Sequence, residues 1–192
     1  MRLVSIDPGA KSGIAVFVDG SLAEVWTLRP RGASGAYALW SAGRSQHVWA
    51  SRYLAWITML SEAHVVVCEQ AWLGLRPGAA MSLARQVGYI EALAQGSTYR
   101  APQGASDACR PEWREVTPSE WRRVARETWG RPMAWPSGRD EKKALAVALV
   151  RERWGITVSD DEADAVLIGW WALMTSNPMG APSARPTTRK GV

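Results

Sequence analysis

The stretch that decides the fold opens the chain: Leu3-Val4-Ser5-Ile6-Asp7-Pro8-Gly9-Ala10-Lys11-Ser12-Gly13-Ile14-Ala15-Val16-Phe17. Its first apolar run predicts a buried strand, Pro8 and Gly9 end that strand, and a second apolar run starts at Ile14. Asp7 is therefore expected at a strand end, beside a tight turn. A buried carboxylate needs a partner or a cation, although an Asp before Pro-Gly is also a common turn former. The rest of the sequence has to decide between these two roles.

Length and composition indicate one globular domain. The chain has 192 residues, of which 47% are hydrophobic and 21% are charged, enough to build a sizeable core. We expect a folded domain over residues 1–175 and a disordered basic tail over residues 176–192. No apolar run approaches the roughly 20 residues that span a bilayer, so a cytoplasmic protein is expected. Cys68 and Cys109 are too few for a disulfide framework and lack the spacing of a zinc site.

Positive charge is concentrated in one part of the chain. The net charge is +5, the isoelectric point is near 9.6, and twelve of the 23 Lys and Arg residues lie between Arg100 and Arg153. This clustering favours a polyanionic partner such as nucleic acid, although a solvated basic face would have the same composition. Tryptophan is frequent, with 12 residues, and suits either base stacking or core packing.

The first part of the chain predicts a sheet that begins as an antiparallel meander. Asp19-Gly20 is a hairpin signal between two apolar runs. The runs expected to be strands are residues 2–7, 13–18 and 22–28. Residues 30–44 are rich in Gly, Ser and Ala and are expected to be a connection, and residues 46–63 an amphipathic helix.

A β-branched run, Val65-Val66-Val67-Cys68-Glu69, predicts a strand that is covered on both faces. Because side chains alternate along a strand, Cys68 and Glu69 point to opposite faces. Cys68 is expected to pack in the core. Glu69, like Asp7, is a carboxylate at the end of a strand.

The second half of the chain predicts four helices and one more short strand, Glu115-Val116. The helices are expected over residues 79–95, from 117–120 to 129, 140–154 and 161–174. Gly88 weakens the first of these helices, so we expect it to lie close to another backbone, either that of the sheet or that of a second subunit. The fold class is α/β, with a mixed five-stranded sheet flanked by helices.

Four carboxylates now stand at element ends. Asp7 and Glu69 end two strands, and Asp161 and Asp164 lie three residues apart on one face of a helix. Such a group of acids would repel strongly without a divalent cation, and hard oxygen ligands suit Mg²⁺ or Mn²⁺. Two such ions can stabilise the attacking and leaving oxygens of phosphodiester hydrolysis. The alternative for Asp161 is interaction with the dipole of a first helical turn.

The sequence resembles the RuvC-type Holliday junction resolvases. The resemblance rests on three ordered stretches, Ile6-Asp7-Pro8-Gly9 with Ser12-Gly13, Cys68-Glu69-Gln70-Ala71-Trp72, and Asp161-Glu162-Ala163-Asp164-Ala165, and it spans roughly residues 2–174. It implies an RNase H-like fold, a homodimer, two Mg²⁺ or Mn²⁺ ions, and paired nicks in a four-way DNA junction. It also implies that Asp7, Glu69, Asp161 and Asp164 hold the metals.

The resemblance assigns further residues to DNA binding and catalysis. Trp72 falls where the family has an aromatic residue that stacks on a junction base, and either Lys142 or Lys143 falls near an active-site lysine. Another family lysine is replaced by Arg122 or Arg123, which suits phosphate contact but not proton transfer. The full set of candidate DNA-binding residues is Trp72, Arg76, Arg122, Arg123, Trp135, Arg139, Lys142 and Lys143.

Two other functions are compatible with parts of the pattern. An actin-like ATPase also opens with an Asp-x-Gly strand and turn, but it requires downstream Gly-rich phosphate and adenosine loops, which this sequence lacks. A catalytically inactive module could bind branched DNA with the same basic helices and aromatic residues. The loop of residues 97–112 and the tryptophans depart from the family pattern, so the substrate preference could differ from that of the cellular enzymes, as it could in a viral member of the family. We expect an enzyme of the bacterial cytoplasm, encoded either by the bacterium or by a phage.

Overall fold

The computed structural model describes residues 1–31, 36–41, 44–49, 52–60, 62–71, 77–96, 110–129 and 135–176. Trp72, Arg76 and Cys109 lie outside the described residues, and so does the expected tail beyond Ser176. Ser176 itself is the last residue of helix α5 (Asp160–Ser176). None of the described helices is both long and apolar enough to cross a membrane.

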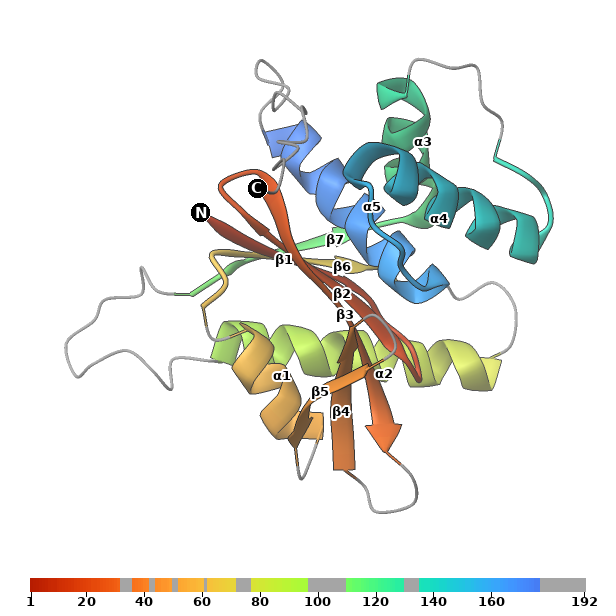
Figure 1. Cartoon of the computed structure of the whole chain (residues 1–192). Coiled ribbons are helices and arrows are strands. Elements are labelled where there is room, and N and C mark those ends of the chain that lie inside the picture. Colours follow the sequence, from red (N-terminus) through yellow and green to blue (C-terminus); the bar gives the residue numbers. More distant parts are fainter. Residues whose placement is uncertain are drawn as a thin grey trace.

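The described strands form one mixed, seven-stranded sheet in the order β5-β4-β3-β2-β1-β6-β7 (Figure 1). β1 pairs with β6, and β6 with β7, in parallel, while all other neighbours are antiparallel. The strands are β1 (Arg2–Asp7), β2 (Ser12–Val18), β3 (Ser21–Arg31), β4 (Ala36–Ser41), β5 (Arg44–Trp49), β6 (Val65–Glu69) and β7 (Glu112–Val116).

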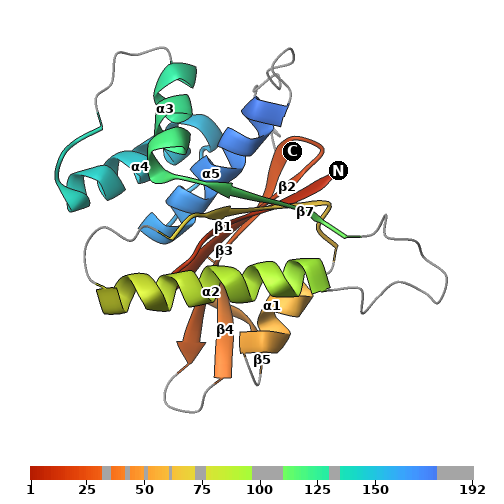
Figure 2. The same ribbon diagram turned by 180° about the vertical axis from the view of Figure 1, so that it is seen from behind.

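Helices cover both faces of this sheet (Figure 1). α1 and α2 lie on one face, and α3, α4 and α5 lie on the other, as the view from behind also shows (Figure 2). Besides α5, the helices are α1 (Arg52–Leu60), α2 (Pro77–Gly96), α3 (Pro118–Thr128) and α4 (Arg139–Trp154). The sheet is therefore the middle layer of three.

Alternation along β1 divides its side chains between the two cores. Val4 and Ile6 pack with α1 and α2, whereas Leu3 packs with the helices of the other face. Ser5 follows Leu3 to that other face, where its hydroxyl donates to the backbone oxygen of Ala165 in α5 at 2.7 Å. Asp7, two residues further on, is on the α5 face for the same reason.

Two glycines let α5 lie directly on the sheet. A Cβ atom on Gly13 of β2 would come within 1.8 Å of the backbone oxygen of Asp161. A Cβ atom on Gly169 of α5 would come within 2.2 Å of the Phe17 ring and 2.5 Å of the Ser5 hydroxyl. All three distances are too short for any side chain larger than hydrogen. The approach of α5 to β1 and β2 therefore depends on glycine at these two positions.

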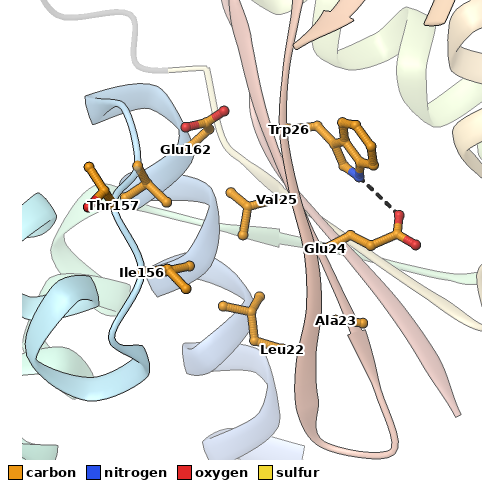
Figure 3. Close-up of a pocket in the computed structure, with 9 residues that line it drawn as sticks. Leu22, Ala23, Glu24, Val25, Trp26, Ile156, Thr157 and Glu162 are labelled. Atoms are coloured by element: carbon orange, nitrogen blue, oxygen red, sulfur yellow. Dashed lines mark hydrogen bonds between the residues drawn. The ribbon is translucent and has the colours of Figure 1, made fainter. Parts of the chain in front are cut away.

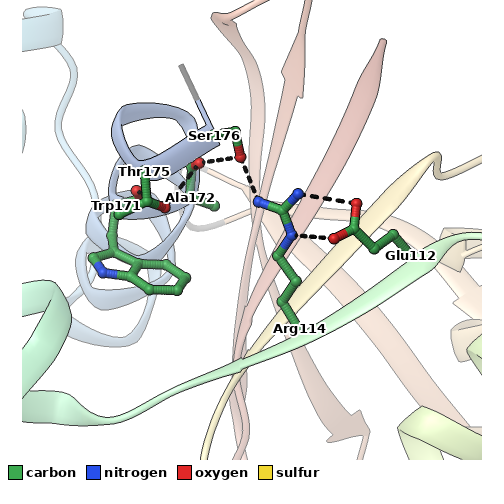
Figure 4. A network of polar contacts seen from close by, with 6 residues as sticks. All are labelled: Glu112, Arg114, Trp171, Ala172, Thr175 and Ser176. Atoms are coloured by element: carbon green, nitrogen blue, oxygen red, sulfur yellow. Dashed lines mark hydrogen bonds and ion pairs between the residues drawn. The ribbon is translucent and has the colours of Figure 1, made fainter. Parts of the chain in front are cut away.

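The C-terminal end of α5 is tied to the edge strand β7 (Figure 4). Arg114 makes a bidentate ion pair with Glu112, at 2.7 and 2.9 Å, and also donates to the hydroxyl of Ser176. That hydroxyl donates to the backbone oxygen of Ala172 at 2.6 Å. The helix is thus held at its far end as well as at its two glycine contacts.

The expected α/β class, the antiparallel meander and the mixed sheet flanked by helices are confirmed, and the five expected strands are all present. The sheet is wider than expected, because residues 36–41 and 44–49 add β4 and β5 where a connection and the start of a helix were predicted. Helix α1 correspondingly begins at Arg52. The extra pairing depends on β3, which continues through Pro30 to Arg31 and pairs there with β4. Pairing with a neighbouring strand can outweigh a weak local preference.

The surroundings of Gly88 differ from the expected close packing against another backbone. It lies on the exposed side of α2, and among the described residues no atom comes within 4 Å of a Cβ built on it. The interpretation that Gly88 permits tight packing on the sheet is therefore wrong. A contact with a second subunit remains a prediction.

Candidate active site

Asp7 and Glu69 are brought together by strand pairing. β1 and β6 are parallel neighbours, and Ile6 is the register partner of Cys68. The next residue on each strand is an acid, so two carboxylates stand side by side at the carboxyl end of the sheet. Cys68 is packed in the core on the α2 side, as expected, and Glu69 faces α3 and α5.

Asp161 and Asp164 approach from above this strand end, on the first turns of α5. Gly13, against which the Asp161 backbone lies, is the register partner of Asp7 in the β1–β2 ladder. The first turn of α5 is therefore held over the strand end that carries Asp7. Chain segments that are far apart in the sequence thus contribute four acids to one place.

The acids act on one another electrostatically. Burial raises the pKa of Asp7 well above its usual range, and the charges of Glu69, Asp164 and Asp161 raise it further. Lys143 opposes this shift. Asp7 is therefore a carboxylate whose negative charge is poorly compensated by the protein itself.

The pKa values of Asp164 and Glu69 are raised as well. Burial, with the charge of Glu69, raises the pKa of Asp164 to about 7, against the opposing charges of Arg122 and Lys143. Burial also raises the pKa of Glu69, and a hydrogen bond from Trp121 and the charge of Arg122 work against it. Near neutral pH Asp164 is therefore poised between its charged and neutral forms.

Lys143, rather than Lys142, lies beside the acids. Its Nζ donates to Asp160 and, at 3.4 Å, to Oδ1 of Asp161. Burial favours the neutral amine, but the hydrogen bonds and charges of both aspartates outweigh it and raise the pKa of Lys143. The same contact lowers the pKa of Asp160, although burial acts in the opposite direction. Asp160 is thereby occupied by the lysine.

On the other side of the site, α3 contributes Trp121 and Arg122. The indole Nε1 of the fully buried Trp121 donates to Oε2 of Glu69 at 3.0 Å. The guanidinium of Arg122 lies 4.7 Å from the centre of the Trp121 ring, and its charge acts on both Glu69 and Asp164. Arg123 instead pairs with Glu127 on the exposed side of α3, at 3.1 Å. Of the two arginines, Arg122 is the one that faces the acids.

The turn after Asp7 is held by α2. Nε2 of Gln86 donates to the backbone oxygen of Gly9 at 3.0 Å and to the hydroxyl of Ser12 at 2.9 Å. The Ser12 hydroxyl also donates to Gly9, at 3.2 Å. This network fixes the loop that leaves the strand at Asp7. No local pattern predicts this network, because Gln86 is more than seventy residues away from the turn.

The donor chemistry of the four acids fits a hard divalent cation. Carboxylate oxygens are the ligands that Mg²⁺ and Mn²⁺ prefer, and the raised pKa values of Asp7 and Asp164 show negative charge in need of a counterion. As the described side chains stand, no three acidic, histidine or cysteine groups are close enough together to ligate one ion. Ligation of one ion by three of these acids would therefore require their side chains to move.

The other candidate DNA-binding residues are dispersed. Trp135 is half-buried: its ring packs edge-on against Trp121, with centroids 5.5 Å apart, and its Nε1 donates to the backbone oxygen of Arg122 at 2.9 Å. It therefore supports α3 from within the protein. Arg139 is exposed at the first turn of α4, and Lys142 follows one turn later. Trp72 and Arg76 lie outside the described residues.

A concave pocket lies next to Glu162, the neighbour of Asp161 in the chain (Figure 3). It is formed between β3 and the segment that joins α4 to α5, and its walls include Leu22, Val25, Ile156 and Val158. Glu162, which belongs to the first turn of α5, lines one end of the pocket. None of the four acids is among the residues that line it, so the group of acids lies outside this pocket.

Comparison with solved structures places this arrangement in a known fold. The chain is similar to RuvC of Thermus thermophilus in complex with a Holliday junction substrate, with a TM-score of 0.51, 16% identity, and coverage of 93% of this chain and 96% of that one. It is similarly related to another Thermus thermophilus RuvC structure, with a TM-score of 0.52, 15% identity, and coverage of 93% and 97%. The fold is RNase H-like and of the RuvC type.

No protein-family model matches the sequence, and no curated protein does. The structure thus has a RuvC-like fold. At 15–16% sequence identity, this similarity shows the fold alone and not the activity. In this chain, Trp121 donates to Glu69 and Lys143 donates to Asp161, while Gln86 holds the turn after Asp7.

Proposed function

We propose that this protein is a metal-dependent, structure-selective endonuclease that resolves four-way DNA junctions by paired, symmetric nicks. The observation that carries the proposal is the group of acids at the carboxyl ends of β1 and β6 and the start of α5, whose charges raise the pKa of Asp7. The RuvC-like fold supports a nuclease. A structural or purely binding role would not explain why so many carboxylates are kept near one another at a cost in stability.

Asp7, Glu69, Asp161 and Asp164 would hold two Mg²⁺ or Mn²⁺ ions, which supply activation of water and stabilisation of the leaving oxygen in phosphodiester hydrolysis. Lys143 would contribute a positive charge beside Asp161, at the edge of the reacting phosphate. Its raised pKa keeps it protonated at neutral pH, which suits an electrostatic role and not that of a general base. Arg122 would do the same on the side of Glu69 and Asp164.

The substrate class follows from charge and symmetry. The basic residues gathered between Arg100 and Arg153 suit contact with the phosphate backbone, which positions a nucleic acid without reading its sequence. Trp72 is proposed to stack on an unpaired base at the branch point. Two symmetric nicks require two active sites related by a two-fold axis, so the proposal includes a homodimer.

The test is cleavage of a labelled synthetic four-way junction and a matching linear duplex, with Mg²⁺, with Mn²⁺ and with chelator. We expect metal-dependent, symmetric nicks confined to the junction, and an Asp7→Asn variant that binds the junction without cutting it. Nicks on flaps and splayed arms as well would indicate a broader branch nuclease. Binding without nicks in any metal would instead favour the catalytically inactive module, and turnover of ATP would favour the actin-like alternative.

A further inference from the structure

One row of residues crosses three strands beneath the start of α5. Asp7 on β1 is the register partner of Gly13 on β2, and Gly13 is the register partner of Thr27 on β3. The backbone oxygen of Asp161 lies where a side chain on Gly13 would be. The first turn of α5 therefore spans the row, with Asp7 at one end and Thr27 at the other.

Glu162 fastens the helix at the Thr27 end. Its side chain is only 7% exposed, and both of its oxygens are engaged. Oε1 accepts from the hydroxyl of Thr27 at 3.0 Å, and Oε2 accepts from the backbone N–H of Ser159 at 2.7 Å. The backbone N–H of Glu162 in turn donates to the Ser159 hydroxyl at 3.3 Å, which completes a capping box at the start of α5.

We propose that Glu162, through its hydrogen bond to Thr27, is the positioning residue that fixes Asp161 over Asp7. The inference rests on the proposed function, in that the acids it positions are taken to hold metal. Asp161 directly precedes Glu162, so a rotation or shift of the helix start that breaks the Glu162–Thr27 contact also moves Asp161. The contact joins α5 to β3, whereas the Ser5 and Gly13 contacts join it to β1 and β2.

The three acids at the start of α5, Asp160, Asp161 and Glu162, have different contacts and therefore different expected roles. Asp160 is occupied by Lys143, and Glu162 is occupied by Thr27 and Ser159. Asp161 accepts the longer contact from Lys143, at 3.4 Å, and is the acid of the first turn whose charge acts on Asp7. Glu162 is thus expected to act through Asp161 without touching an ion or DNA.

Thr27→Val tests the contact, because valine has the shape of threonine without its hydroxyl. The measurement is calorimetric titration of the metal-free full chain with Mn²⁺ in the absence of DNA. Loss of a hydrogen bond that orients a ligand lowers metal affinity by about 10- to 100-fold in known sites, and we expect a loss in this range. Thr27→Ser, which keeps the hydroxyl, should retain the affinity of the wild type.

A matched control separates positioning from helix capping. Thr117 and Glu120 form the same kind of capping box at the start of α3, where Glu120 is exposed. Glu120→Gln should therefore leave Mn²⁺ affinity unchanged, whereas Glu162→Gln, which cannot accept with both side-chain atoms, should lower it. Should Thr27→Val fail to fold, the comparison of Glu162→Gln with Glu120→Gln decides the question.

Wild-type affinity in both Thr27→Val and Glu162→Gln would overturn the inference, even if the wild type nicks junctions normally. Conversely, a wild type that binds Mn²⁺ but cuts no DNA would overturn the proposed function, while a weaker titration of Thr27→Val would still support the positioning role. A wild type that takes up no Mn²⁺ would overturn both.

Discussion

Gly13 lies against the backbone of Asp161 so closely that an added Cβ atom would be 1.8 Å from the carbonyl oxygen. This contact joins the second strand to the first turn of the last helix, across nearly the whole length of the chain. It seats the start of the helix that carries Asp161 and Asp164 against the sheet. The distance between the strand-borne acids and the helix-borne acids therefore depends on the absence of a side chain at residue 13.

Gly13→Ala should push the start of α5 away from β2. We expect junction cleavage to fall by about 100-fold, since a displacement of about 1 Å at reacting groups can have that effect. Stability should fall by about 1–3 kcal/mol, as for other overpacked sites. Gly96→Ala is the control, because Gly96 is exposed at the end of α2 and, among the described residues, no atom comes within 4 Å of a Cβ built on it. Cleavage rates and urea unfolding of both variants check this, and equal behaviour of the two would contradict it.

Lys143→Ala should lower the cleavage rate and Lys142→Ala should not. Only the Lys143 amine donates to Asp161, so its removal takes a positive charge from the edge of the site. We expect a loss of about 100-fold in kcat, comparable with the loss of one stabilising donor in other enzymes. Single-turnover cleavage at saturating junction measures this. A larger loss in the Lys142 variant would mean that the wrong lysine has been assigned.

The two lysines also show what the sequence could and could not predict. Neighbouring residues on a helix point in directions about 100° apart, so choosing between them requires the rotation of α4 about its axis. That rotation is set by packing against α5 and not by residues 142 and 143 themselves. The faces of Asp7 and Glu69, in contrast, could be predicted from the sequence. Side chains alternate along β1 and β6, and this alternation is a local rule.

Contacts between segments that are distant in the chain could not be predicted from the sequence. Trp121 and Glu69 are separated by 52 positions, and no local pattern marks the indole as a donor to that carboxylate. The Ser159-x-x-Glu162 spacing, in contrast, is a capping-box pattern that could have been recognised before the structure. Strands β4 and β5 were missed because their residues have no decisive periodicity and depend on pairing with the extended end of β3.

Asp164→Asn should stabilise the metal-free protein at pH 8 but not at pH 4. A pKa raised from 3.8 to about 7 means that the folded state binds this proton more tightly than the unfolded state. Stability is therefore lost as the pH rises from about 4 to about 7, and asparagine avoids that loss. Because the acids share the effect, we expect about 2 kcal/mol, or about 4–8 °C in Tm.

Thermal unfolding with chelator at the two pH values measures this gain. Saturating Mn²⁺ should reverse the order at pH 8, because ions that bind only the folded wild type stabilise it by mass action. The same variant should cut no junction. If Asp164→Asn were less stable than the wild type at pH 8 in chelator, the carboxylate would be compensated by the protein, and the argument for a counterion would fail.

Trp121→Phe should move the acid limb of the pH–rate profile to higher pH. Phenylalanine keeps most of the apolar burial but removes the N–H that donates to Glu69 at 3.0 Å, and this hydrogen bond is one of the effects that lower the pKa of Glu69. Without this hydrogen bond Glu69 stays protonated to higher pH, so the active, deprotonated form is reached only at a higher pH. Trp135→Phe is the matched control, because it loses an indole donor to the Arg122 backbone and leaves Glu69 untouched. An acid limb that shifts equally in both variants would show that general loosening of α3, and not the Glu69 hydrogen bond, sets the profile.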